Sequence, residues 1–356
     1  MTDPSRPDGP AGPDAPEDSP DPETEREPET EPGRALGLTA FTMEGRQAPA
    51  LFVVGWLATL VGGGFVALRF LGVAGFPGVF LFYAGLAVLV VGLVLLGGSQ
   101  AVERRAAGLA YAGPSPMLVL LAVLAATQVA GLIVGLPLEL IGGSIPRPLG
   151  DLIAVTLQAL VTVGVIRLMV IGADALSWRD MGIRFDREQV LRGLATGAAY
   201  TPVVVAVVWI LGAVLAQFVT QVPESPLPPT GNAVGVLLHL LAGAVIAPVA
   251  EELLFRGFAL TAWSRSVGDR PALIRVTIVF VLAHVLTVGG DTFGDAAQLA
   301  FVAAVGRVPV AIALGWLFIR TRSLWAPIGL HAAYNAVLIL LAEAYASGAL
   351  GAVAPS

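Results

Sequence analysis

The sequence predicts an all-α, polytopic helical membrane protein with about nine transmembrane helices. Hydrophobic residues make up 56% of its 356 residues and charged residues only 13%, which is not the composition of a soluble domain. The hydrophobic residues fall in runs of about 20, long enough to span the hydrocarbon core of a bilayer as a helix. We therefore expect a multi-pass protein of the plasma membrane, with the lipid bilayer as a partner and no nucleic acid.

The first 34 residues differ from the rest of the chain. They hold eleven acidic residues against three arginines, nine prolines and almost no aliphatic residue. Such a segment cannot bury enough apolar surface to offset the entropy lost on ordering. It also lacks the basic start and apolar centre of a signal or transit peptide. We predict a disordered acidic tail over residues 1–34, transmembrane helices and connectors over 35–188, and a second transmembrane region over 189–348.

Helix-stopping breaks separate the predicted spans. These breaks are Gly75-Phe76-Pro77, Pro114-Ser115-Pro116, Pro146-Arg147-Pro148 and the proline-rich stretch Pro223–Pro229. The spans are roughly Ala50–Leu68, Gly78–Gly98, Met117–Leu136, Leu149–Ile171, Val190–Ala216, Ala233–Trp263, Ala272–Val288, Ala296–Ile319 and Leu324–Tyr345.

The distribution of arginine predicts the orientation, because short cytoplasmic loops are enriched in basic residues. One set of alternate loops contains Arg34, Arg46, Arg104, Arg105, Arg179, Arg184, Arg187, Arg265, Arg270, Arg275, Arg320 and Arg322. The opposite set contains only Arg69 and Arg147. We therefore expect a cytoplasmic N-terminus and an outside C-terminus.

Three charged residues lie inside the sixth predicted span: Glu251, Glu252 and Arg256. Even lenient scales assign about 2.5–3.5 kcal/mol to one charge at the centre of a membrane helix, so charges at such positions indicate a function. Residues four apart share one helix face, which predicts a buried pair between Glu252 and Arg256. Glu251 lies about 100° further round the helix and is expected to face a cavity.

Two histidines and an asparagine lie in later spans. His284 follows Phe280 by one turn, and Asn335 follows His331 by one turn, so each pair shares a helix face. At 1.5 Å per residue, Glu251 and His284 lie about 20 Å from the cytoplasmic end and His331 about 14 Å. These depths predict a common site, provided that the sixth helix continues past Arg256, although a proline at position 248 is expected to kink it.

This set of residues fits two kinds of chemistry. In one, Glu251 is the general base that activates a water molecule, a histidine orients that water, and the other histidine and Asn335 stabilise an oxyanion. In the other, Glu251, His284 and His331 hold a divalent metal such as zinc. No His-Glu-x-x-His pair is present, and the chain has no cysteine. The residues alone do not decide between a metal-free site and a metal site.

The motifs resemble those of the CAAX-processing and bacteriocin-processing (CPBP, Abi) intramembrane endopeptidases, also called type II CAAX prenyl endopeptidases. The resemblance covers about Val234–Leu340 and rests on three motifs: Glu251-Glu252-x-x-x-Arg256, Phe280-x-x-x-His284 and Leu324-Trp325-Ala326-Pro327-Ile328-x-x-His331-x-x-x-Asn335. A further family motif, a glycine-spaced helix, fits only loosely at Phe301, Gly306 and Gly315, and Arg307 interrupts it.

The resemblance implies that residues 189–348 form a protease core. It implies that Glu251 activates water, His284 is its partner, and His331 and Asn335 stabilise the oxyanion. Glu252, Arg256 and Phe280 then give structural support. Members of the family have also been described as metalloproteases, so the metal alternative stays open.

The substrate implied by the resemblance is a membrane-associated peptide or a prenylated or otherwise lipidated protein. Two other functions fit the buried carboxylates less well: a transporter with a proton or cation relay, and a non-catalytic membrane scaffold. For the remaining intramembrane polar residues we expect His239 to make a helix–helix hydrogen bond, and Arg307 to be paired or to reach the interface. The sequence does not predict an oligomeric state.

Overall fold

The computed structural model describes residues 43–349, with gaps at 44, 141–144, 220–222, 224–226 and 287. These residues belong to one compact unit, Ala40–Ser356. Their regular structure is helical throughout, with no β-strand among the residues described, so the predicted all-α class is confirmed. The predicted disordered tail, residues 1–34, lies outside the described residues.

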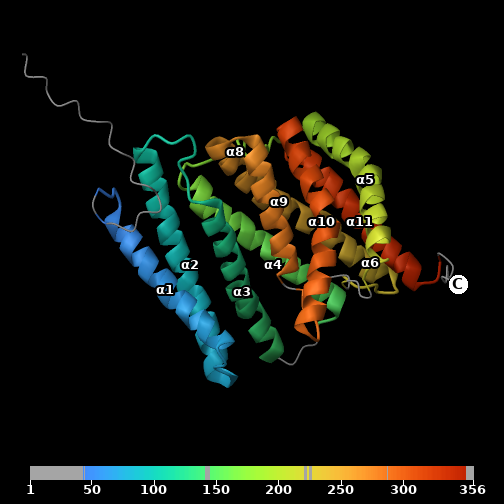
Figure 1. The fold of residues 1–356 in the computed structure, drawn as a ribbon, viewed down its shortest axis with the longest axis horizontal. Coiled ribbons are helices and arrows are strands. Elements are labelled where there is room, and N and C mark those ends of the chain that lie inside the picture. The colour runs from blue at the N-terminus through green and yellow to red at the C-terminus, as the bar shows by residue number, and fades with distance from the viewer. Residues whose placement is uncertain are drawn as a thin grey trace, which may run out of the picture. The chain divides into compact units, whose positions relative to one another are not determined.

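The first half of this unit is a row of helices. It consists of α1 (Pro49–Phe70), α2 (Gly75–Ala106), α3 (Pro116–Leu140) and α4 (Arg147–Ile166), which continues into the π-helix η1 (Arg167–Ile171). Each helix packs against the next along the chain, and α1 and α2 form the most extensive of these contacts (Figure 1). This half contains none of the predicted site residues.

The second half contains α5 (Arg187–Leu215), α9 (Asp269–Val285), α10 (Phe293–Thr321) and α11 (Trp325–Ala346). Between α5 and α9 the chain is helical from Ala233 to Val267. Its five parts are α6 (Ala233–Leu240), η2 (Leu241–Ile246), α7 (Ala247–Glu252), η3 (Leu253–Leu260) and α8 (Thr261–Val267). We call this continuous stretch the 233–267 segment. The segment packs against α4 and against α11. Its last two parts, η3 and α8, contact α9 (Figure 1).

Each of the nine predicted spans overlaps a helix, but among the described residues only eight helical stretches are long and apolar enough to cross a membrane. The exception is α9, which has 17 residues and ends at Val285. At 1.5 Å per residue it is about 25 Å long, less than the thickness of a typical hydrocarbon core of about 30 Å. The prediction of a full span to Val288 is therefore wrong in length, because the helix ends sooner than the apolar sequence does.

The helix is irregular around Pro248, where a kink was predicted, and the irregularity takes the form of π-helical turns. The sixth helix continues to Trp263, as expected, but two π-helical stretches flank the turn that contains Pro248. A π-helix forms hydrogen bonds to the carbonyl five residues back, and such turns are rare except near functional sites. Proline has no N–H, so Pro248 cannot donate to the carbonyl five residues before it in η2. That carbonyl therefore lacks its helical donor.

The 233–267 segment forms the centre of the fold. All eight residues of η3 are buried, and Phe258, Ala259 and Leu260 have no exposed surface. On an outer helix such as α1, by contrast, Val54, Leu57 and Leu60 are about half exposed or more. Apolar side chains on that surface are stable in lipid. Arg256, the charged residue of η3, therefore lies in a fully buried part of the described structure.

A close crossing of α5 and α11 fixes the helix that carries His331. A Cβ atom added at Gly197 would lie 1.9 Å from the carbonyl oxygen of Ala326, and one added at Gly329 would lie 2.2 Å from that of Leu194. Only glycine permits the two backbones to approach this closely.

Candidate active site

The carboxylate of Glu251 lies between two imidazoles. Its Oε2 atom is 3.5 Å from Nε2 of His284 and 3.9 Å from Nε2 of His331. The three side chains come from the 233–267 segment, α9 and α11, and the structure brings them together. The side chains of Glu251 and His284 are 22% and 28% exposed, so the site is open on one side.

The other ring nitrogen of each histidine is already hydrogen-bonded. Nδ1 of His284 lies 2.8 Å from the carbonyl oxygen of Phe280, and Nδ1 of His331 lies 2.7 Å from Oε1 of Glu252. A carbonyl oxygen only accepts hydrogen bonds, so Nδ1 of His284 carries the proton. In a neutral imidazole the lone pair is then on Nε2, the atom that faces Glu251.

Glu252 and Arg256 form the buried pair that the sequence predicted. Nη1 of Arg256 donates to Oε1 of Glu252 at 2.8 Å, and neither side chain has any exposed surface. Nη2 of Arg256 donates to the carbonyl oxygen of Ala311 in α10, and the guanidinium lies 4.4 Å from the ring centroid of Phe280. The ring of Phe280 also contacts His284, at 4.4 Å between centroids. The pair thus ties together three helical stretches around the histidines.

Asn335 does not face Glu251 in the way that the two histidines do. Its Nδ2 donates at 2.8 Å to the carbonyl oxygen of Gly243 in η2. Gly243 lies five residues before Pro248, so its carbonyl is the one that lacks a π-helical donor. The asparagine side chain replaces this missing donor, a contact that the sequence did not predict. One of its two N–H groups is thereby used.

The candidate metal ligands match zinc in type. Each histidine presents Nε2 to Glu251, while its Nδ1 bonds to a carbonyl or carboxylate oxygen. Zinc-bound histidines usually donate their other ring N–H to such an oxygen. Among the described residues, however, no group of three or more His, Cys, Asp or Glu side chains is arranged to hold a metal ion. The types of ligand atom therefore suit a metal ion, but the present arrangement of Glu251, His284 and His331 does not form a metal site.

Two other intramembrane polar residues were singled out in the sequence. Nε2 of the buried His239 lies 3.1 Å from Oδ2 of Asp151, which joins α6 to α4 as a helix–helix contact. Arg307, near the middle of α10, donates from Nη1 to the carbonyl oxygen of Ala303 on its own helix.

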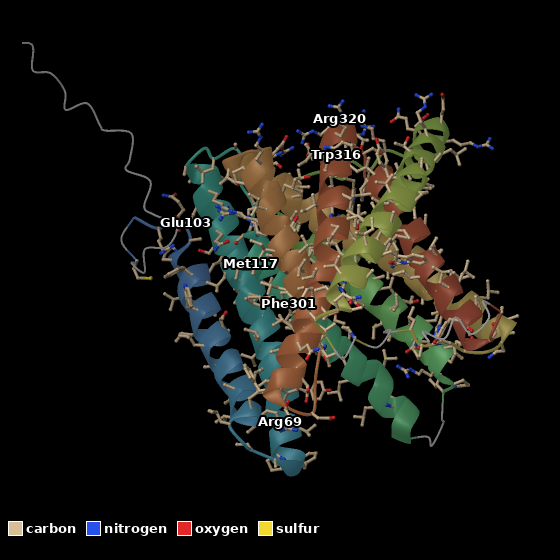
Figure 2. All side chains as sticks on the ribbon, turned by 45° about the vertical axis from the view of Figure 1, so that its right-hand side comes forward. Arg69, Glu103, Met117, Phe301, Trp316 and Arg320 are labelled. Atoms are coloured by element: carbon tan, nitrogen blue, oxygen red, sulfur yellow. The ribbon has the colours of Figure 1, made fainter. Side chains whose placement is uncertain are left out.

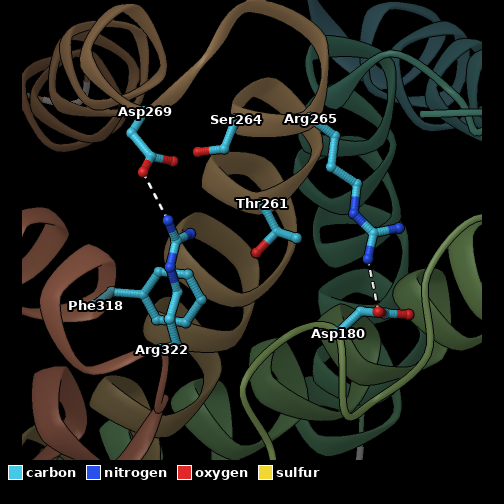
Figure 3. Close-up of a pocket in the computed structure, with 7 residues that line it drawn as sticks. All are labelled: Asp180, Thr261, Ser264, Arg265, Asp269, Phe318 and Arg322. Atoms are coloured by element: carbon cyan, nitrogen blue, oxygen red, sulfur yellow. Dashed lines mark hydrogen bonds and ion pairs between the residues drawn. The ribbon is translucent and has the colours of Figure 1, made fainter. Parts of the chain in front are cut away.

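A cavity of ≈ 300 Å³ is lined by residues of α8, the start of α9 and the end of α10 (Figure 3). Two ion pairs border it: Arg265 with Asp180 and Arg322 with Asp269, each at 2.6 Å. Thr261, Ser264 and Phe318 complete its lining. None of the predicted site residues lines this cavity. It is therefore not the cavity that Glu251 was expected to face. Both pairs link residues far apart in the chain, which no local pattern could predict.

The sequence also gave no role to Tyr334. It is buried and lies three residues after His331 on α11. Its spacing from His331 places it near the same helix face, which was the one available signal.

Comparison with protein families finds one match. Residues 233–337 match the family described as type II CAAX prenyl endopeptidase Rce1-like. The search of curated proteins and the search of solved structures both find no match. Every predicted site residue, from Glu251 to Asn335, lies within the matched range, so residues 233–337 are similar to the type II CAAX prenyl endopeptidase Rce1-like family that the motifs indicated.

Proposed function

We propose that this protein is an intramembrane endopeptidase that hydrolyses a peptide bond with a water molecule activated by Glu251 and His284. The proposed substrate is a membrane-associated or lipidated protein or peptide. The family match supports peptidase activity at the level of the family, and the reaction is inferred from the residues of this chain.

The observation that supports this proposal is the meeting of three hydrogen-bond acceptors. Oε2 of Glu251 faces Nε2 of both histidines at 3.5 and 3.9 Å. With Nδ1 as the protonated nitrogen, each neutral imidazole offers only a lone pair there. Oε2 itself is buried and has no hydrogen-bond donor. Three acceptors without a donor repel one another unless a water molecule, a proton or a cation lies between them. A water donating to Glu251 and His284 satisfies this need and is held as a nucleophile.

The proposed reaction then follows from the positions of the protons. Glu251 takes a proton from the water while the water oxygen forms a bond to the substrate carbonyl carbon. This step gives a tetrahedral oxyanion. His284, beside Glu251, receives or relays this proton to the leaving nitrogen, and the C–N bond breaks. The products are a new carboxylate and a new amine.

His331 and Asn335 are the proposed donors to the oxyanion. The ring of His331 is neutral while the water is bound, and its Nε2 can donate to the oxyanion only after the ring takes up a second proton, since Nδ1 already bonds to Glu252. Asn335 keeps one free N–H after its bond to Gly243. Glu252 and Arg256 keep His331 in place and are proposed to act through it.

Zinc is the alternative activator. Glu251, His284 and His331 would hold the ion, which would lower the pKa of a bound water to near neutral. The roles of Glu252 and the Phe280 carbonyl, which orient the two imidazoles, would be unchanged.

The test is hydrolysis of a membrane peptide mixture by the purified protein in liposomes, read by mass spectrometry. Glu251→Gln should lower product formation by a factor of about 10² to 10⁴, the usual contribution of a general base, while the thermal unfolding temperature changes little. Glu188→Gln, at an exposed position on α5, is the matched control and should retain activity. Treatment with a chelator separates the two activators, because only a metal-bound water is lost with it.

Two results would remove the proposal. One is equal hydrolysis by wild type and Glu251→Gln. The other is a Glu251-dependent proton flux across the liposome membrane without any hydrolysis, which would indicate a transporter.

A further inference from the structure

Arg307 is a cation inside a membrane helix, and no acidic side chain of the described part of the chain is in contact with it. It lies midway between Phe293 and Thr321, between Phe301 and Trp316, which Figure 2 labels along α10. At 1.5 Å per residue, each end of the helix is about 20 Å away, too far for the side chain to reach the interface. Its expected alternative, an ion pair, is also not found among the described residues.

The hydrogen bonds of Arg307 are largely unused. A guanidinium has five N–H donors. The bond recorded for it runs from Nη1 to the carbonyl oxygen of Ala303, one turn back on α10. Arg307 is only half-buried, so part of its side chain is accessible. A charged group with free donors at this depth requires an anion or water beside it.

The groups near Arg307 belong to the candidate active site. Arg307 lies one helical turn before Ala311 on α10, and the carbonyl oxygen of Ala311 accepts a hydrogen bond from Nη2 of Arg256 at 3.2 Å. Arg307 is therefore on the part of α10 that lies beside the Glu252–Arg256 pair, and its charge acts on Glu251 and His284. No contact of 4.0 Å or less joins its guanidinium to the Glu251 carboxylate in the described structure, so the two are neighbours without being an ion pair. A peptide that brings its scissile bond to Glu251 therefore passes within the field of Arg307.

We propose that Arg307 binds a carboxylate of the substrate close to the scissile bond. This inference rests on the proposed hydrolysis at Glu251 and adds a substrate class to it: peptides with a negative charge near the cleavage site. A guanidinium binds a carboxylate through two parallel hydrogen bonds, and the low dielectric of the membrane strengthens the pair. The carboxylate comes either from an Asp or Glu side chain or from the C-terminus of the peptide.

The experiment compares matched forms of one peptide that wild type cleaves and Glu251→Gln does not. The first form is unchanged, the second has a C-terminal amide, and the third has Gln or Asn in place of each acidic residue near the cleavage site. A fourth has lysine there. Wild type should prefer one carboxylate form over its neutral counterpart by about 10- to 100-fold in kcat/KM, as expected for a hydrogen bond to a charged group. If the C-terminal amide lowers kcat/KM, the carboxylate is that of the C-terminus. If Gln or Asn lowers it, the carboxylate is that of an acidic side chain.

Variants of Arg307 test whether this side chain causes the preference. Arg307→Gln should abolish it, mainly through KM. Arg307→Lys should retain part of it, because lysine keeps the charge without the planar fork. Arg307→Glu should favour the lysine peptide. Arg320→Gln, on the same helix but exposed near its end, is the matched control and should keep the wild-type preference (Figure 2).

The outcomes distinguish this inference from the proposed function. If Arg307→Gln lowers kcat equally for charged and neutral peptides, or leaves the preference intact, Arg307 is not the carboxylate site although Glu251 still hydrolyses. Binding of the same peptides to Glu251→Gln provides a readout without hydrolysis. A preference for the carboxylate form that disappears in Glu251→Gln/Arg307→Gln supports the inference, and equal binding of all forms to Glu251→Gln overturns it. Thermal unfolding of each variant confirms that it is folded.

Discussion

At the scale of single residues, Glu252 is the hub of the site. Its Oε1 atom accepts hydrogen bonds from both Arg256 and His331, at 2.8 and 2.7 Å. Its Oε2 atom and Nε of Arg256 are buried without a hydrogen-bond partner among the described atoms. Such a pair is costly to desolvate, and its stability depends on both partners being present. Glu252 therefore has two separable effects: it compensates a buried cation and it holds an imidazole.

These two effects can be separated by mutation. Glu252→Gln and Arg256→Met should each destabilise the fold by about 3–5 kcal/mol, because each leaves an uncompensated buried charge. The double variant should be less destabilised than the sum of the two, since neither charge remains. Hydrolysis should stay low in the double variant, because His331 has lost its carboxylate. Thermal unfolding and peptide hydrolysis measure the two effects on the same samples.

The chain contains a matched control for this cycle. Glu188 and Arg192 have the same spacing on α5, but their side chains are 77% and 73% exposed. Exposed helical pairs of this kind contribute about 0.3–0.5 kcal/mol, so Glu188→Gln and Arg192→Met should have little effect. Additive losses in the Glu252/Arg256 cycle would show that the two residues do not act as a pair.

The sequence could predict the Glu252–Arg256 pair but not its third member. Residues four apart on one helix meet whatever surrounds them, so local spacing is sufficient. The bond from His331 to Glu252 depends on how α11 crosses the 233–267 segment, and 79 residues separate the two in the chain. The depth estimates placed His331 at a height similar to that of the two glutamates, but they did not indicate that it would bond to Glu252. The bond from Asn335 to Gly243 could not be predicted for the same reason, since it depends on the π-helical register.

At the scale of helices, the contact of α5 with α11 decides where His331 lies. Gly197 faces the backbone of α11, where an added Cβ would lie 1.9 Å from the Ala326 carbonyl oxygen and 2.5 Å from the Leu330 nitrogen. Leu330 is adjacent to His331 in the chain. A side chain at position 197 must therefore displace the part of α11 that carries the histidine.

We expect Gly197→Ala to destabilise the fold by about 1–3 kcal/mol and to reduce peptide hydrolysis further than this loss of stability explains. Gly212→Ala is the control on the same helix. An added Cβ there has no neighbour within 4 Å, and replacing a helical glycine by alanine gains up to about 1 kcal/mol. The two substitutions should thus shift the thermal unfolding temperature in opposite directions. Equal shifts would mean that the close crossing does not constrain α11.

The sequence predicted the number and order of helices better than their internal form. Apolar runs of membrane length identify helices because lipid leaves backbone groups no other way to be satisfied. The same runs do not indicate whether a turn closes onto the fourth or the fifth carbonyl, so η2 and η3 were missed and only Pro248 signalled an irregularity. The early end of α9 was missed because the sequence stays apolar beyond Val285.

At the scale of the whole unit, two polar layers lie at opposite ends of the helices. One contains the ion pairs Arg265–Asp180 and Arg322–Asp269. The other contains the hydrogen bonds of Glu343 with the backbone of Thr230 and Gly231. The first layer holds the loops that are rich in arginine and the second those that are poor in it. The predicted orientation places the arginine-rich layer in the cytoplasm.

Two serine-to-cysteine substitutions test this orientation in a chain that has no cysteine of its own. Ser266, at the end of α8, and Ser347, just after α11, are both exposed and lie at the two opposite ends. In intact cells a membrane-impermeant maleimide should label Ser347→Cys and not Ser266→Cys, and permeabilisation should make both react. The parent chain reports the background, because it has no thiol. The reverse pattern would place the arginine-rich loops outside, so that the helices cross the membrane in the opposite direction.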